Sequence, residues 1–371
     1  MKSEDLKELK EFGFELCSLK RSFYSSDIKK AKLLIKQFLK KEKIRFVEEK
    51  FTVSKYVPSE GDVYVEDKRI EAITYGGSPI SEEEGTAVLW DPEIDGEVDI
   101  KGKIVISREG GIPTRQKAEM AEQGGAKALI TYIEEIDTLF VGNVGKSPVP
   151  VVNVRRSDVQ QLIGNKIKVR SKVLKKKAEC SNIYFDVGKG PLIYVTAHID
   201  TKPFVYGAID NGISVVLLLF IARELHRKEE DLFCRYRFLI TDCEEFGLEG
   251  ASFHVQNKPE HAYYAVNLDS VGWHNPAIIY KDAYGYNDEE LMDKFLKHIK
   301  DFSIDIPFRE SRTGVSDHVV FKRKGIKSMF LSSNPFTLRH TDFDTYELVA
   351  WNKVEMWHDL LLTFFRRFDR L

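Results

Sequence analysis

Residues 191–210, PLIYVTAHIDTKPFVYGAID, decide the fold of this chain. They open with a run of β-branched and aromatic residues, Ile193–Thr196, which is typical of a buried strand. That strand ends in His198 and Asp200, and a glycine-containing turn then leads to Asp210 and a long apolar helix. In an open α/β sheet, ligands bind outside the carboxyl ends of the strands. The polar residues that follow this apolar strand are therefore candidate site residues.

His198 and Asp200 are separated by one residue, so on an extended backbone both side chains point to the same side. This arrangement suits a metal-binding imidazole whose second ring nitrogen is oriented by a carboxylate. A buried histidine that is satisfied by a neighbouring aspartate has the same spacing. The pair alone leaves both interpretations open.

Two further strand-like segments end in acids. Arg235–Thr241 leads to the adjacent pair Glu244 and Glu245, and Ala262–Leu268 leads directly to Asp269. Neighbouring carboxylates at the end of a buried strand cost free energy unless cations compensate them. The alternative for the glutamate pair is an exposed helix N-terminus, where the helix dipole favours acids.

A last strand, Lys327–Leu331, leads towards a polar segment that contains His340. The segments after the strands together offer five candidate metal ligands: His198, Asp210, Glu245, Asp269 and His340. Two imidazoles and three carboxylates suit Zn²⁺, or Co²⁺ as a substitute, better than a soft thiolate site would. If one carboxylate bridges two ions, each ion has one histidine, one terminal acid and the shared acid, and a position stays open for water.

The composition narrows the class of protein. The chain has 371 residues, of which 43% are hydrophobic and 31% charged, and its net charge is −2. These values predict a globular protein with room for two domains, and argue against nucleic acid or a membrane surface as a general partner. No apolar run is long enough to span a membrane, and residues 1–21 lack a signal-peptide core, so we expect a cytoplasmic protein with free cysteines.

The type of secondary structure that the sequence predicts changes twice along the chain. Helical spacing near 4–20 and 25–41 and a strand-like stretch at 44–56 are followed, from about Tyr56 to Leu174, by short strands and turns. Long α/β elements then resume and end in a helix from about Tyr346 to Arg370. We predict an α/β fold: a three-layer, mixed-sheet domain from residues 1–55 and 175–371, with a smaller, β-rich α+β domain inserted at 56–174.

The inserted block resembles the protease-associated domain. The matching pieces are KGKIVISREGG at 101–111, KAEMAEQGGAKALITY at 117–132 and PVPVVNVRRSDVQQLIG at 148–164. The resemblance implies a non-catalytic lid or a domain that selects substrates. An insertion that only packs against the larger domain is the alternative.

The flanking segments, roughly residues 15–55 and 178–371, resemble the di-zinc peptidase family that includes bacterial leucyl aminopeptidases and glutamate carboxypeptidase. Six motifs occur in the family's order: HID at 198–200, GAIDN at 207–211, DCEEFGLEGA at 242–251, NLDSVG at 267–272, SDH at 316–318 and HTDFDT at 340–345. Six ordered motifs are far more specific than any one of them.

The resemblance implies two zinc ions per chain, held by His198, Asp210 and Asp269 on one side and by Asp210, Glu245 and His340 on the other. Asp210 would bridge the ions, Asp200 would orient His198, and Glu244 would be the general base. A cis peptide bond is implied after Asp210. The chain departs from the family at Arg339, where many members have a tyrosine, which puts the group that stabilises the oxyanion in doubt.

These features predict a metal-dependent exopeptidase that acts on peptides, with an aminopeptidase as the first choice. A carboxypeptidase of the same family is the alternative, and Arg309, Arg312 or Arg339 would then contact the substrate carboxylate. A glutaminyl cyclase with one zinc ion and a non-catalytic binding protein on the same fold are weaker alternatives. The sequence leaves a homo-oligomer open.

Overall fold

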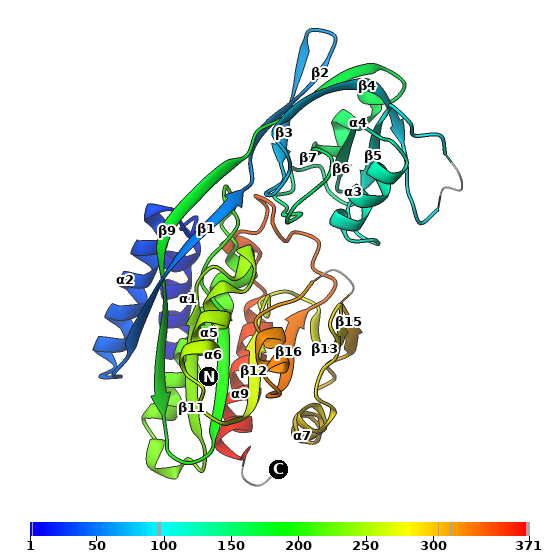
Figure 1. The fold of residues 1–371 in the computed structure, drawn as a ribbon. Helices are drawn as coiled ribbons and strands as arrows, with labels where there is room; N and C mark the ends of the chain where they lie inside the picture. The colour runs from blue at the N-terminus through cyan, green and yellow to red at the C-terminus, as the bar shows by residue number, and fades with distance from the viewer. Residues whose placement is uncertain (2, 95–97, 303, 312–313, 369–371) are drawn as a thin grey trace.

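The computed structural model describes residues 1, 3–94, 98–302, 304–311 and 314–368. Figure 1 shows two bodies, each built on its own sheet, with two long strands running from one body to the other. We call the larger body the open-sheet domain and the smaller one the barrel. Among the described residues, no helix has both the length and the apolar character needed to cross a bilayer.

The open sheet is mixed. Its strands lie in the spatial order β1 (Val47–Val57), β9 (Leu174–Val187), β11 (Arg235–Thr241), β10 (Leu192–His198), β12 (Ala262–Leu268), β16 (Lys327–Ser333), β13 (Pro276–Asp282) and β14 (Gly285–Tyr286), and β15 (Phe308–Glu310) pairs with β13. The central strands β11, β10, β12 and β16 are parallel. Their carboxyl ends therefore meet at one edge of the sheet, which is where the candidate site residues follow.

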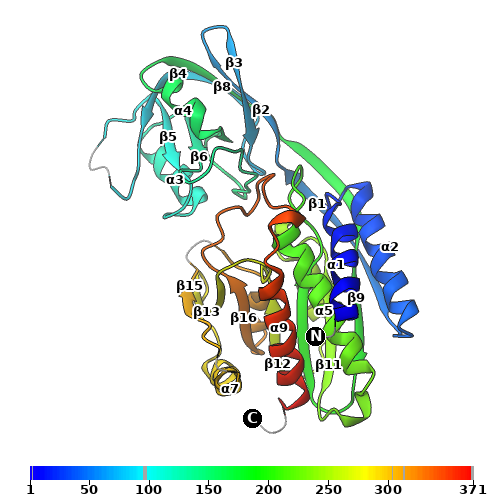
Figure 2. The same cartoon turned by 180° about the vertical axis from the view of Figure 1, so that it is seen from behind.

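Helices cover both faces of the open sheet and make three layers, as predicted. One face carries α1 (Ser3–Cys17), α2 (Ser26–Lys41), α5 (Ile213–His226), α7 (Glu289–Lys300) and α9 (Trp351–Arg366), seen in Figure 2. The other face carries α6 (Glu249–Asn257) and α8 (His318–Arg323). α5 is apolar around nearly its whole circumference because it lies between the sheet and the helices α1 and α9.

The barrel occupies residues 59–171, inside the interval predicted for the inserted domain. Its closed sheet contains β2 (Ser59–Val65), β3 (Lys68–Thr74), β7 (Val151–Asn153), β6 (Ala128–Tyr132), β5 (Ile104–Arg108), β4 (Ser81–Leu89) and β8 (Lys166–Ser171), with helices α3 (Thr114–Gln123) and α4 (Arg156–Leu162). The strands β1 and β9 pair antiparallel, over the full length of β1 and from Leu174 to Tyr184 of β9, and join it to the open-sheet domain.

One predicted boundary is wrong. A short 3-10 turn occupies Tyr346–Leu348, and the C-terminal helix begins only at Trp351 and ends at Arg366. Residues 369–371, at the predicted end of that helix, lie outside the described residues. The four cysteines are buried and free, as expected.

Candidate metal centre

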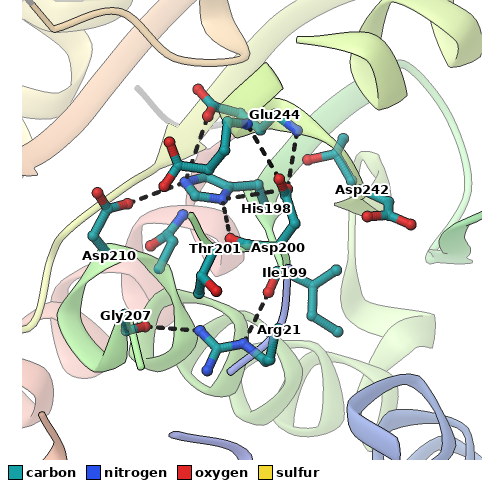
Figure 3. Close-up of polar contacts among 12 residues, drawn as sticks. Arg21, His198, Ile199, Asp200, Thr201, Gly207, Asp210, Asp242 and Glu244 are labelled. Carbon is teal, nitrogen blue, oxygen red and sulfur yellow. Dashed lines mark hydrogen bonds and ion pairs between the residues drawn. The ribbon is translucent and has the colours of Figure 1, made fainter. Parts of the chain in front are cut away.

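The parallel strands bring the predicted site residues together at one edge of the open sheet. β10 ends at His198, β11 is followed by the 3-10 turn Glu244–Phe246, and β12 is followed by Asp269. The remaining two ligands come from loops: Asp210 from the turn Ala208–Gly212 before α5, and His340 from the segment after β16. All five predicted ligands and Glu244 meet here, and Figure 3 shows His198 between Asp210 and Glu244.

The site has two halves that share Asp210. His198 Nε2 lies 3.3 Å from Asp210 Oδ1 and 3.7 Å from Asp269 Oδ2. His340 Nε2 lies 3.4 Å from the other oxygen, Asp210 Oδ2, and 3.0 Å from Glu245 Oε2. We call His198 with Asp269 the His198 half, and His340 with Glu245 the His340 half. Asp210 thus presents one oxygen to each half, as a bridging carboxylate does.

The residues of both halves fit a divalent cation that prefers nitrogen and oxygen ligands. Two groups, His198 with Glu244 and Asp269, and Asp210 with Glu245 and His340, each place their ligand atoms within 4.8 Å of one another. Glu245 Oε1 is buried without a hydrogen-bond partner, so it is free to bind a cation. The set contains no thiolate, which favours zinc or cobalt in a mixed site.

The pKa values of the two adjacent glutamates are shifted in opposite directions. Burial raises the pKa of Glu244 well above its usual value, against the pull of His198 and with the help of Glu245. Burial also acts on Glu245, but His340 and Lys202 outweigh it and lower the pKa of Glu245 to about 2. Glu244 therefore accepts a proton readily, whereas Glu245 stays ionised as a ligand must.

Asp200 acts on more than His198. Its main-chain oxygen lies 3.1 Å from His198 Nδ1, while its carboxylate Oδ1 is 3.7 Å from that nitrogen. The carboxylate instead accepts hydrogen bonds from the backbone N–H groups of Glu244, at 2.9 Å, and Glu245, at 3.2 Å (Figure 3). Asp200 thus orients the histidine mainly through its carbonyl group, and its charge holds the turn that carries both glutamates.

No sequence pattern pointed to Arg21, which is fully buried behind the site. Its guanidinium donates hydrogen bonds to five main-chain carbonyls: those of Leu16, Leu19, Ile199, Tyr206 and Gly207. Two of these bonds are drawn in Figure 3, to Ile199, which lies between His198 and Asp200 just after β10, and to Gly207 at the turn before Asp210. Arg21 therefore fixes the backbone on both sides of the His198 half.

Asp344 supports Asp210 from the opposite direction. Its carboxylate accepts hydrogen bonds from the N–H groups of Ile209, at 2.7 Å, and Asp210, at 3.0 Å. Burial and then the charge of Asp210 raise the pKa of Asp344 to about 7. The residue lies within the HTDFDT motif, so the motif was the available signal for it, but its partner was not predictable.

The backbone of the site adopts uncommon conformations. The peptide bond between Asp210 and Asn211 is cis, as the resemblance implied. Ser270 and His340 have positive φ angles of 62° and 60°. Gly207 has a φ of 56°, and a Cβ atom there would lie 2.3 Å from the carbonyl oxygen of Asp210. Residues with positive φ such as Ser270 and His340 cluster at functional sites, where the surrounding structure holds them in place.

Two family matches cover the two bodies. Residues 182–365 match peptidase family M28, and residues 63–162 match the PA domain. The chain belongs to peptidase family M28. The barrel is its inserted PA domain, and the mixed sheet with helices on both faces is the fold of the family.

Individual proteins agree with this assignment. Aminopeptidase YwaD of Bacillus subtilis is 29% identical over 364 residues, which cover 90% of this chain and 78% of that protein. The solved structure of BSAP, a zinc aminopeptidase from Bacillus subtilis, has a TM-score of 0.77 at 23% identity and covers 98% of this chain and 95% of its own. The aminopeptidase from Aneurinibacillus sp. strain AM-1 has a TM-score of 0.72 at 23% identity, with 98% and 92% coverage. The fold is therefore shared along the whole chain.

Two positively charged side chains lie against the carboxylates of this M28 site. Arg339 Nε is 3.4 Å from Asp210 Oδ2, and Lys202 Nζ is 3.0 Å from Glu245 Oε2. Both side chains line the cavity beside the site. Of the other arginines considered from the sequence, Arg309 lies on the exposed strand β15, and Arg312 lies outside the described residues.

A cavity of about 680 Å³ leads to the site from between the two bodies. On the open-sheet side it is lined by Asp269, Phe330 and His340. On the barrel side it is lined by residues 109–115 and by Phe140 and Asn143. The PA domain thus forms one wall of this cavity.

Proposed function

We propose that this M28 protein is a zinc-dependent aminopeptidase that removes N-terminal residues from peptides and uses two zinc ions. The observation that carries the proposal is the position of Asp210, which directs one oxygen to each of two histidine–carboxylate halves, with Glu244 beside them. The similarity to an aminopeptidase over 90% of the chain supports the choice of reaction.

The residues of the site have separate roles in this reaction. When bound, the zinc ions supply Lewis-acid chemistry that polarises the scissile carbonyl and lowers the pKa of water. Glu244 lies 4.0 Å from His198 Nε2, further than Asp210 and Asp269, and its raised pKa suits a group that takes a proton from water. It then returns that proton to the leaving amine.

Glu245 is unsuited to the same task. It is held by His340 at 3.0 Å and by Lys202 at 3.0 Å, and its lowered pKa keeps it without a proton. Asp200 holds the backbone of both glutamates, so it sets their relative position without touching the substrate. This division explains why two adjacent glutamates follow β11.

Carboxypeptidase action is the second candidate, because Arg339 and Lys202 line the cavity and offer positive charge to a substrate carboxylate. Both cations, however, already face carboxylates of the site. Because these ion pairs already occupy Arg339 and Lys202, the aminopeptidase is favoured, in which the enzyme recognises the free α-amino group of the peptide. A cyclase with a single zinc ion would leave one half without a role.

The test is mass spectrometry of a mixed peptide pool after incubation with the zinc-loaded protein, with Glu244→Ala as the control. We expect peptides shortened stepwise from the N-terminus and no products with the variant. Shortening from the C-terminus would establish the carboxypeptidase, and loss of ammonia from N-terminal glutamine would establish the cyclase. A pool that stays unchanged although two zinc ions are bound would refute a general peptidase.

A further inference from the structure

A loop of the barrel touches the candidate ligand His340 directly. The loop belongs to the segment between β6 and β7, and we call residues 138–143 the docking loop. The backbone N–H of Val141 donates a 2.9 Å hydrogen bond to the carbonyl oxygen of His340. The ring of Phe140 lies 5.5 Å, centroid to centroid, from the imidazole of His340. Because His340 has a left-handed φ of 60°, its backbone needs support of this kind.

The same loop holds the surroundings of the His340 half at two more points. Thr138 Oγ1 donates a 2.6 Å hydrogen bond to Asp342 Oδ1, two residues beyond the histidine. Asn143 Nδ2 donates at 3.4 Å to the main-chain oxygen of Glu245, the second ligand of this half. Val141 also packs in one apolar cluster with Val205 of the open-sheet domain and Ile73 of β3.

The docking loop is itself fixed within the barrel. Gly142 accepts a 3.0 Å hydrogen bond from the N–H of Gly76, and Phe140 N–H donates at 2.7 Å to Asn153 Oδ1. A Cβ atom at Gly142 would lie 1.9 Å from the ring of Tyr75, so the backbone packs against that ring too closely for any side chain. The loop is therefore a rigid support that the barrel presents to the site.

The His198 half is supported by the open-sheet domain. The imidazole of His198 is held by Asp200, and Asp269 is held by a 3.1 Å bond from its N–H to Leu331 and a 2.9 Å bond from Ser270 Oγ. These partners lie on or beside the parallel strands. Glu245 of the His340 half is also held from the open-sheet domain, by Asp200 and Lys202. The halves thus differ in that the barrel contributes direct contacts to the His340 half, whereas the contacts given above for the His198 half all come from the open-sheet domain.

From this asymmetry we propose that the docking loop is a positioning element that sets the affinity of the His340 half for its metal ion and leaves the His198 half unaffected. The inference rests on the proposed two-metal function. Partners that orient metal ligands change metal affinity by roughly 10- to 100-fold when they are removed. By thermodynamic linkage, binding of that ion in turn stabilises the docked position of the barrel.

The experiment measures zinc affinity rather than activity. The full chain, stripped with a chelator, is titrated with Zn²⁺ by calorimetry for the parent, Phe140→Ala and Thr138→Val. Thr114→Val is the matched control, because Thr114 lines the same cavity but donates its 2.9 Å hydrogen bond within the barrel, to Glu109. His340→Asn identifies the binding step that belongs to the His340 half.

We expect Phe140→Ala to weaken the step that His340→Asn abolishes by roughly tenfold, and Thr138→Val to weaken the same step by less. The other step, and both steps in Thr114→Val, stay within about twofold of the parent. Combined with His340→Asn, Phe140→Ala has no further effect on the remaining ion. Hydrogen exchange at the Val141 amide becomes faster when zinc is removed from the parent.

The outcomes separate this inference from the proposed function. If the parent binds two ions and the loop variants leave both affinities unchanged, the inference is refuted and the function stands. Equal weakening of both steps together with a lower thermal midpoint would also refute it, because the loop would then be a general structural support. A parent chain that binds no zinc would refute the function and the inference with it.

Discussion

Both sheets of this protein contain parallel strands whose carboxyl ends carry polar residues, but the polar groups differ in kind. In the barrel, β5, β6 and β7 are parallel, and the polar groups near their ends form a chain of hydrogen bonds: Tyr75 to Thr131 at 2.8 Å, Asn153 to Thr131 at 2.9 Å, and Phe140 N–H to Asn153 at 2.7 Å. In the open sheet, the corresponding edge holds two histidines and several buried carboxylates. The barrel's chain of neutral polar groups is paired within the protein, whereas the open-sheet edge gathers buried charges.

The difference teaches that strand-end geometry is not sufficient for a site. The polar groups of the barrel's hydrogen-bond chain pair with one another. Ser107 Oγ, near the end of β5, is buried without a partner, but it is a neutral hydroxyl and not a charge. Carboxylates at the ends of β10, β11 and β12 crowd together, shift one another's pKa values and leave atoms such as Glu245 Oε1 unpartnered. Unbalanced charge at a buried edge is what marks the functional end.

The largest expected effect comes from the acid with the raised pKa. Glu244→Gln keeps the size of the side chain but removes its ability to take a proton. We expect kcat/KM to fall by about 10²- to 10⁴-fold, with zinc content unchanged by elemental analysis. Glu109→Gln, which alters the acid next to the barrel's hydrogen-bond chain, is the comparison and should change kcat/KM by less than about threefold. A larger loss with Glu109→Gln would erase the distinction between the edges.

The next largest effect is on stability, and it concerns buried basic side chains that donate hydrogen bonds to main-chain carbonyl groups. Arg21→Met removes a fully buried guanidinium with five carbonyl partners, so we expect the free energy of unfolding of the open-sheet domain to fall by about 3–5 kcal/mol. The counterpart in the barrel is Lys117. Its Nζ donates hydrogen bonds to the main-chain carbonyl oxygens of Arg108, at 2.5 Å, and Gly110, at 2.9 Å.

Lys117→Met leaves only two carbonyls without their partner, and we expect it to cost about 1–2 kcal/mol. Denaturant unfolding, followed by hydrogen exchange in each body separately, measures both variants because the bodies need not unfold together. Equal losses in the two variants would show that the site edge demands no more support than the barrel does.

Asp317 is a buried acid behind the site, and we expect its replacement to increase stability. Asp317 accepts hydrogen bonds from Thr241 and Thr196, and burial raises its pKa to about 6. An unfolded aspartate has a pKa of about 3.9. Ionisation is therefore harder in the folded state, and stability is lost as pH rises from about 4 to about 6.

Asp317→Asn removes that loss. We expect the metal-free variant to be more stable than the parent by about 2–3 kcal/mol at pH 8, since roughly two pKa units at about 1.4 kcal/mol each are involved. The difference should disappear toward pH 4 in urea titrations across that range. A variant that is less stable at pH 8 would mean that the carboxylate is compensated by contacts that asparagine cannot replace.

The candidate ligands could be predicted from the residues that follow the strands, because recognising a strand end needs only local sequence. Apolar runs that end in acids or histidine identify strand ends, and parallel pairing brings the ends of β10, β11 and β12 to one edge. The structure places all five predicted ligands there, and their role as ligands stays a prediction that zinc titration tests. Asp210 and His340 lie in loops that no periodicity describes, and the order of the motifs supported their selection from the segments after the strands.

The supports of the site were out of reach for the same reason. Arg21 follows a helix without any local sign of burial, and its partners Ile199 and Gly207 lie 178 and 186 residues away. The docking loop meets His340 across a domain boundary. The start of the last helix was misplaced because apolar residues continue through the 3-10 turn at Tyr346 and keep a helical spacing up to Trp351.

The smallest expected effect tests the barrel's hydrogen-bond chain. Tyr75→Phe removes the buried hydroxyl that bonds to Thr131 and Glu109 but keeps the ring against which Gly142 packs. Thr131 retains Asn153 as a partner, so we expect a loss of about 1 kcal/mol in the stability of the barrel. Zinc affinity should not change, because the docking loop depends on the ring and on Asn153. A loss of zinc from the His340 half in this variant would show that the barrel's hydrogen-bond chain extends to the metal centre, so that the two edges act as one network.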